Sequence, residues 1–128
     1  MAIFTHVTVG TNNLEKARQF YDAVLAPLGL KRLKDFGDGG SCWGQTSEEF
    51  MVLKPANGQP ATHANGGTIG FACASPELAK AFHDAGVANG GKSIEDPPGW
   101  RQGAAGKIYL AYLRDPFGNK ICASYRGS

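Results

Sequence analysis

The sequence of 128 residues lacks any apolar run near the roughly 20 residues that a transmembrane helix needs. It also lacks a run of basic residues: 13 Lys and Arg stand against 11 Asp and Glu, a net charge of +2. The first residues, MAIFTHVTVG, have neither the basic start nor the long apolar stretch of a signal peptide. We therefore expect neither a membrane partner nor a nucleic-acid partner.

Cysteine is scarce. Cys42, Cys73 and Cys122 are odd in number, widely spaced and form no CxxC. This argues against a disulfide scaffold and predicts a reducing, cytoplasmic location. The stretches GDGG (37–40) and ANGG (64–67) lack the Lys-Ser/Thr that follows a phosphate-binding loop.

Glycine, in contrast, is abundant: there are 18, some of them in short clusters at 37–40, 66–67 and 90–91, which is typical of a fold with many tight turns. Hydrophobic residues make up 42% of the chain, enough for a packed core. We expect a single domain over residues 1–128.

The two halves of the chain repeat each other. HVTVGTNNLEKARQFYDAVLAPLGLK, which starts at His6, aligns without gaps with TIGFACASPELAKAFHDAGVANGGKS, which starts at Thr68. Both segments predict a strand, an N-cap (Asn12 or Asn13, and Ser75), an amphipathic helix and a terminating glycine. Such self-similarity indicates tandem modules.

In each half, three more strands are predicted after the opening strand and the helix. The first half predicts strands at residues 3–9, 30–34, 41–44 and 50–54, and the second half at 92–95, 108–113 and 120–125 after its opening strand. We interpret this as an α+β fold of two βαβββ modules (1–55 and 67–128) joined by a connector (56–66). Curved mixed sheets are expected to form a cup, with the helices on the outer face.

These features resemble the vicinal oxygen chelate superfamily, which includes glyoxalase I, extradiol dioxygenases and bleomycin or fosfomycin resistance proteins. FYDAVLAPLGL and DPFGNKI carry the resemblance, which covers essentially the whole chain. It implies a cup that often holds a divalent metal between a His on the first strand of a module and a Glu on the last. It also implies dimers, so we expect a homodimer.

The family's metal ligands carry over only in part. His6 matches the first-strand His, whereas Thr68 stands where the second module would offer His or Gln. Cys122 stands where many relatives have Glu. Threonine is a weak ligand, and cysteine suits zinc or copper(I) better than magnesium or manganese. We predict a degenerate site with no cofactor, or with a divalent metal (Zn, Ni, Mn or Fe) held incompletely.

His6 has three interpretations: a hydrogen-bonded residue of the cup wall, a metal ligand or a catalytic base. In the strand at 120–125, Cys122 and Ser124 face the opposite way from Ile121 and Ala123. A reactive Cys122 thiolate would need a basic neighbour, for which Lys120 is the nearest candidate, but a small filler of the cup wall is the simpler interpretation.

Aromatic and polar residues supply further candidates. The stretch PPGWRQGAAGK (97–107) is long and glycine-rich, which favours a binding loop whose Arg101 pairs with an acidic ligand, or a solvated loop. Trp43 and Gln45, two positions apart, are expected to share one face of a strand. The candidate ligand-binding residues are Thr8, Trp43, Gln45, Trp100, Arg101, Tyr109, Cys122 and Ser124.

Three functions remain open at this point. The first is a glyoxalase-like lyase or isomerase in which a metal acts as a Lewis acid. The second is a metal-free protein that sequesters a drug or metabolite. The third is an enzyme like the extradiol dioxygenases. All three predict a small-molecule ligand in the cup.

Overall fold

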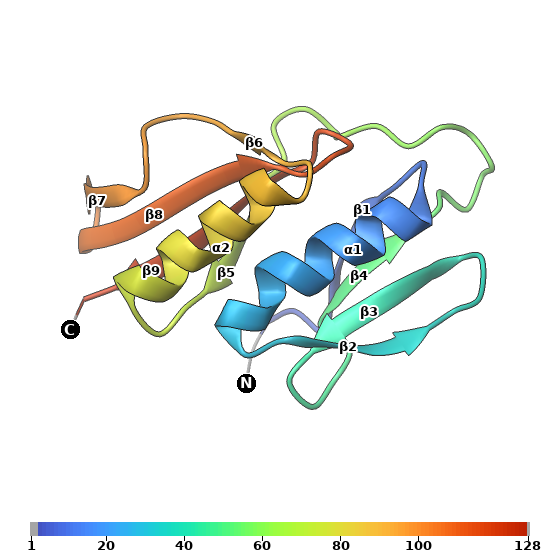
Figure 1. Cartoon of the computed structure of the whole chain (residues 1–128), viewed down its shortest axis with the longest axis horizontal. Helices are drawn as coiled ribbons and strands as arrows, with labels where there is room; N and C mark the ends of the chain where they lie inside the picture. Colours follow the sequence, from blue (N-terminus) through green and yellow to red (C-terminus); the bar gives the residue numbers. More distant parts are fainter. Residues whose placement is uncertain (1–2, 128) are drawn as a thin grey trace.

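The computed structural model describes residues 3–127, and its first half forms a four-stranded mixed sheet with one helix (Figure 1). The elements are β1 (Val7–Gly10), α1 (Leu14–Leu25), η1 (Ala26–Leu28), β2 (Lys31–Asp35), β3 (Gly40–Gly44) and β4 (Phe50–Leu53). The strand order is β1-β4-β3-β2, with β1 parallel to β4 and the other pairs antiparallel. Residues 3–6, expected in the first strand, precede it.

The second half repeats this arrangement with β5 (Ile69–Ala72), α2 (Pro76–Ala88), β6 (Lys92–Ser93), β7 (Gly99–Gly103), β8 (Gly106–Arg114) and β9 (Lys120–Arg126). The order β5-β9-β8-β6 matches that of the first sheet, and β5 is parallel to β9. The tandem βαβββ prediction is confirmed.

The prediction of a loop at 97–107 is wrong, because most of these residues belong to two paired strands. Residues 99–103 form β7, which pairs with β8 from Gly99↔Leu110 to Gly103↔Gly106. Both β6 and β7 lie along β8, so they are one edge strand interrupted at residues 94–98. Glycine and polar residues without alternation hid this strand from the sequence pattern.

Capping side chains fix the starts of both helices, as predicted. Asn13 Oδ1 accepts a hydrogen bond from the Lys16 N–H at 3.1 Å, and Ser75 Oγ accepts one from the Leu78 N–H at 3.2 Å. Gly29 ends the first helical segment at φ +78°, a conformation that favours glycine.

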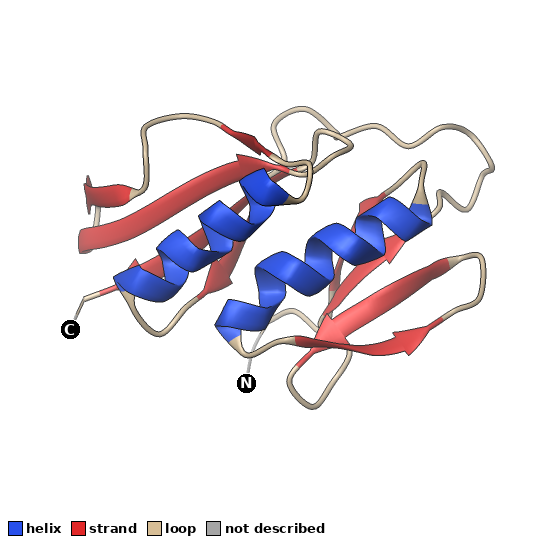
Figure 2. Cartoon of the chain, in the orientation of Figure 1, coloured by secondary structure: helices blue, strands red, loops and turns tan. Residues whose placement is uncertain are grey.

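Both helices lie on one face of the two sheets (Figure 2). They pack against each other, and the shared core includes Phe50 of β4 and Phe71 of β5, whose ring centroids are 5.0 Å apart. Gly86 of α2 is buried in this core, and a Cβ there would lie 2.3 Å from Leu113 Cδ1, whereas its neighbour Val87 is exposed. We call the sheet face away from the helices the open face.

The DPFGN turn, residues 115–119, connects the two halves through hydrogen bonds. Asp115 accepts hydrogen bonds from the Tyr21 hydroxyl of α1 at 2.6 Å and from the Asn119 amide at 2.8 Å. The Asn119 amide also donates to the Gly10 carbonyl at the end of β1. Burial, and then the Asp115 carboxylate, raise the pKa of Tyr21 well above its ordinary value.

The connector is fixed at both ends. The Asn12 side chain forms two reciprocal hydrogen bonds with the Ala61 backbone, and His63 lies against Gly118 in the DPFGN turn. Among residues 3–127 no helix is long and apolar enough to cross a membrane.

Candidate functional site

A cleft of about 490 Å³ opens between the two modules, in the size range of small-molecule sites. It lies where β1 and β4 of the first module meet β5 of the second. Its apolar lining includes Phe4, Val7, Leu30, Phe50, Ile69 and Phe71, and its polar lining includes Thr5, His6, Glu49 and Thr68. The arrangement suits a largely apolar molecule with one or two polar groups.

His6 sits at the mouth of this cleft, exposed and immediately before β1. The Thr5 hydroxyl lies 3.0 Å from His6 Nδ1, a hydrogen bond whose direction depends on the imidazole tautomer. Glu49 occupies the matching position before β4, because Val7 pairs with Phe50. The cleft therefore holds an imidazole, a carboxylate and the Thr68 hydroxyl, which are groups that can orient a ligand or exchange a proton with it.

Cys122 and Ser124 line a second cavity, of about 500 Å³, on the open face of the second sheet. Gly70 keeps it open, since a Cβ there would lie 3.4 Å from Cys122 Sγ. Burial raises the pKa of Cys122 to about 11 even though the nearby Lys120 ammonium lowers it. The thiol is therefore protonated at neutral pH, which argues against a nucleophilic thiolate.

Thr8 also faces away from the core, because Val7 and Val9 on either side pack against it. It lines the cavities near the connector. The structure thus brings Thr8 and Thr68 to the gap between β1 and β5, and places Cys122 and Ser124 one strand away.

Trp43 and Gln45 do not share a strand face. Trp43 is fully buried and donates from Nε1 to Asp22 Oδ1 of α1 at 3.0 Å. It borders the cleft but faces the helices, as does Ser41, whose hydroxyl accepts from Arg18 of α1. Gln45 is exposed beyond the end of β3. The residues of β3, GSCWG, do not alternate between apolar and polar side chains, so their pattern does not indicate this orientation.

Trp100 and Tyr109 lie away from the cleft. Tyr109 shares its face with Ala111 and Leu113, which are core residues, so it faces α2. Trp100 pairs with it, packs edge-on at 5.5 Å between centroids, and stays 49% exposed. These aromatic residues form a cross-strand row with Tyr125 on the helix side.

The Arg101 guanidinium is held by backbone carbonyls. It donates to the carbonyls of Asp96, Pro97 and Gly99 at 2.9 Å each. These bonds hold the interruption between β6 and β7 in place. They involve Nη1 and Nη2 and not Nε–H, so the pairing of Arg101 with an acidic ligand stays a prediction.

A family model described as Glyoxalase/Bleomycin resistance protein/Dioxygenase superfamily matches residues 3–123. The chain belongs to this superfamily. A solved structure of a glyoxalase/bleomycin resistance protein from Albidiferax ferrireducens T118 is 52% identical, with a TM-score of 0.92, over 98% of this chain and 100% of that one. The family resemblance seen in the sequence is confirmed.

More distant solved structures share the fold of this superfamily member. A glyoxalase-related enzyme from Fulvimarina pelagi is 14% identical, with a TM-score of 0.73, over 98% of this chain and 89% of that one. A family enzyme from Burkholderia phytofirmans PsJN is 15% identical, with a TM-score of 0.70, over 97% and 98%. A comparison with curated proteins finds no match.

The residues of this superfamily member do not fit the divalent metal that its family implies. Thr8 and Gly70 are equivalent positions in the alignment of the two modules. Thr8 pairs with Met51, and Gly70 pairs with Cys122, so Met51 is the first-module counterpart of Cys122. The four related positions are then His6, Met51, Thr68 and Cys122, of which only His6 is a good ligand for a hard or borderline cation. Over residues 3–127 no three His, Cys, Asp or Glu side chains group as a metal site.

Met51 was missed by the sequence analysis. The parallel registers of β1 with β4 and of β5 with β9 identify it, and these registers cannot be obtained from the sequence repeat alone because the loops after the helices differ in length.

Proposed function

We propose that this protein binds a small organic molecule in the cleft between its modules and does so without a metal ion. The observation that carries the proposal is the cleft itself, whose walls are mostly apolar and whose mouth holds His6, Glu49 and Thr68. Such a lining gives affinity through apolar burial and orientation through a few polar groups. Apolar burial and a few orienting polar groups are sufficient for a protein that sequesters or transports a ligand.

The donor set supports the metal-free part of the proposal. A His, a Met, a Thr and a protonated Cys offer one strong nitrogen ligand, and structural zinc sites need four ligands while catalytic ones need three. The lyase, isomerase and dioxygenase alternatives would need a more complete set.

Binding in the cleft is tested by NMR. Amide signals of residues that line the cleft are followed while a library of small aromatic and aliphatic carbonyl compounds is added. Hits are expected to shift the signals of Val7, Ile69 and Phe71, and Thr68→Trp is expected to abolish these shifts by filling the cleft. Thr46→Trp, an exposed position in the turn before β4, is the matched control and should leave them unchanged.

The metal-free part is tested by calorimetry with Ni²⁺, Zn²⁺ and Mn²⁺ on protein purified without a His-tag or chelator. No stoichiometric binding is expected for the natural sequence. The variant Met51→Glu/Thr68→His/Cys122→Glu should gain a one-to-one site that disappears when His6→Ala is added. Stoichiometric metal in the natural protein that is lost in His6→Ala would show that the proposal is wrong.

A further inference from the structure

Three basic side chains share one row across the second sheet. Lys92 of β6 pairs with Arg114 of β8, and Arg114 pairs with Lys120 of β9. Residues in register lie on the same face of a sheet. We call Lys92, Arg114 and Lys120 the basic row.

The basic row lies on the open face. Ser93, the neighbour of Lys92, faces the helices, because its hydroxyl is 2.7 Å from His83 Nε2 of α2. The Lys120 ammonium lies 5.0 Å from the ring centroid of Tyr112, which shares the open face with Cys122. Successive side chains of a strand alternate, so Lys92 and Lys120 both point away from the helices.

Like charges directly opposite each other on neighbouring strands destabilise a sheet. One carboxylate offsets them: Glu95 forms an ion pair with Lys120. Asp115, next to Arg114 in sequence, is turned toward α1 and accepts from Tyr21 and Asn119. Three cations therefore stand against one carboxylate on this part of the open face.

One end of the basic row, at Lys120, borders a cavity that can admit an anion. Lys120 lines a space of about 280 Å³ together with Thr68, Asn119 and His63. The Arg114 guanidinium is oriented by one hydrogen bond, from Nη1 to the Gly118 carbonyl at 2.7 Å, and a guanidinium has five N–H donors. Lys120 therefore connects the cavity to the two other cations of the basic row, Arg114 on the neighbouring strand and Lys92 on the strand beyond it.

We propose that the basic row binds a small dianion, a phosphate or a dicarboxylate, with Glu95 as its intramolecular competitor. A bound dianion neutralises the repulsion between Lys92, Arg114 and Lys120 and accepts charge-assisted hydrogen bonds from them. Displacement of the Glu95 carboxylate from Lys120 makes room for it. The proposal is independent of the ligand in the cleft between the modules.

The test is a calorimetric titration of the whole chain with inorganic phosphate and, separately, with oxalate, at pH 7.5 and constant ionic strength. Saturable binding to one site is expected. Lys92→Met and Lys120→Met should each weaken it by roughly tenfold or more, the effect of losing a charged hydrogen bond. Glu95→Gln should strengthen it several-fold, because the competing carboxylate is gone.

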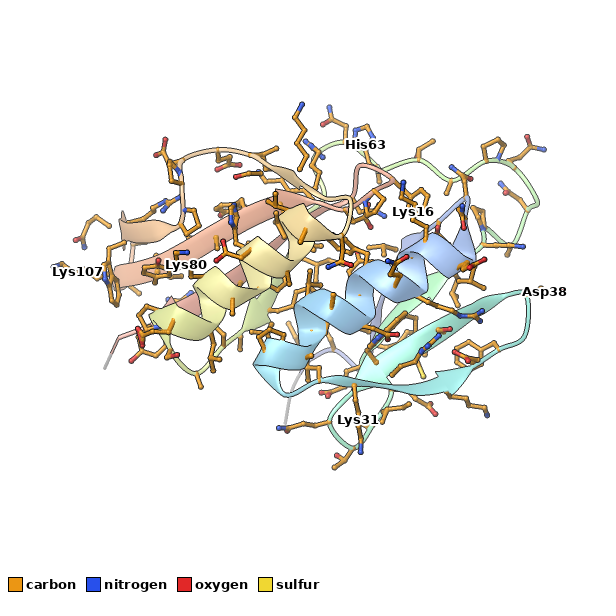
Figure 3. The ribbon with its side chains drawn as sticks, in the orientation of Figure 1. Lys16, Lys31, Asp38, His63, Lys80 and Lys107 are labelled. Carbon is orange, nitrogen blue, oxygen red and sulfur yellow. The ribbon has the colours of Figure 1, made fainter. Side chains whose placement is uncertain are left out.

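Lys107→Met is the matched control. The substitution removes one positive charge from β8, but Lys107 lies at the end of the sheet far from His63 (Figure 3). The affinity of this variant for the anion should therefore stay within about twofold of that of the natural protein. Lys92→Met should also raise the unfolding temperature in anion-free buffer, because it removes cross-strand repulsion.

Binding of phosphate alone, oxalate alone or both assigns the class of dianion. Three results would overturn the proposal: no saturation with either anion, equal loss of affinity in Lys107→Met, or weaker binding in Glu95→Gln.

Discussion

At the scale of the residue, the buried Cys122 thiol makes folding stability fall at alkaline pH. Its pKa is raised from 9.0 to about 11 by burial. The unfolded chain therefore loses this proton first as pH rises, and folding stability falls between pH 9 and pH 11 after being fully present below pH 9. The loss at pH 10.5 is about 2 kcal/mol from this group.

Urea unfolding at pH 8 and pH 10.5 measures the effect. The natural protein should lose about 2 kcal/mol more between the two pH values than Cys122→Ala does. Other groups that titrate, Tyr21 among them, contribute equally to both proteins, so the difference isolates Cys122. Equal losses in the two proteins would contradict the assignment.

Several single residues were predicted correctly in position, and others were not. Alternation along the last strand placed Cys122 and Ser124 together on the face opposite Ile121, and the register with β8 agrees. The same reasoning failed for Trp43, because β3 is buried on both faces and its sequence carries no alternation. No sequence pattern reveals that the Arg101 guanidinium binds backbone carbonyls.

At the scale of the element, the DPFGN turn acts as a joint between the modules. Its Asp115 receives the Tyr21 hydroxyl from α1, and both groups are buried. Tyr21→Phe removes a hydrogen bond to a charged acceptor and should lower the free energy of unfolding by about 1.5–3 kcal/mol.

Chemical denaturation checks this value, with Tyr109→Phe as the control. The Tyr109 ring packs on Trp100, and its hydroxyl makes no hydrogen bond within residues 3–127. Its removal should change stability by no more than about 0.5 kcal/mol. A similar cost for both variants would mean that ring packing, and not the bond to Asp115, stabilises the joint.

Element types were more predictable than strand registers. Caps and apolar spacing identified both helices, since Asn13, Ser75 and the buried faces are local signals. The basic row was not visible, because residues 92, 114 and 120 are brought together only by pairing between strands. The tight DPFGN turn was a usable clue for one pair, since it places Arg114 opposite Lys120.

At the scale of the whole molecule, two large apolar side chains beside the cleft favour pairing with a second copy. Ile3 is 88% exposed and Phe4 is 69% exposed, and Phe4 lines the cleft. Burial of such side chains stabilises an interface. Light scattering after size exclusion is expected to give twice the mass of one chain, and Phe4→Asp should shift the population toward one chain.

Val87→Asp is the control for this prediction, because Val87 is exposed to 49% on α2, on the helix side of the molecule. It should leave the mass unchanged. A single-chain mass for the natural protein at about 100 μM, or equal disruption by Val87→Asp, would contradict pairing through the N-terminal segment.

The repeated architecture could be predicted from the sequence because two similar segments of one chain are expected to fold into the same module. The cleft did not follow, since it depends on how β1 and β4 of one half approach β5 of the other. That approach is set by side chains such as Phe50 and Phe71, which any packed core would also contain.

The fixed connector has a consequence for assembly. Because Asn12 holds Ala61 and His63 rests on the DPFGN turn, the connector keeps the two modules of one chain at an effective concentration that no separate molecule matches. Domain swapping, in which two chains trade halves, is thereby disfavoured. Each chain should keep its own pair of halves, and larger assemblies should form by the addition of complete chains.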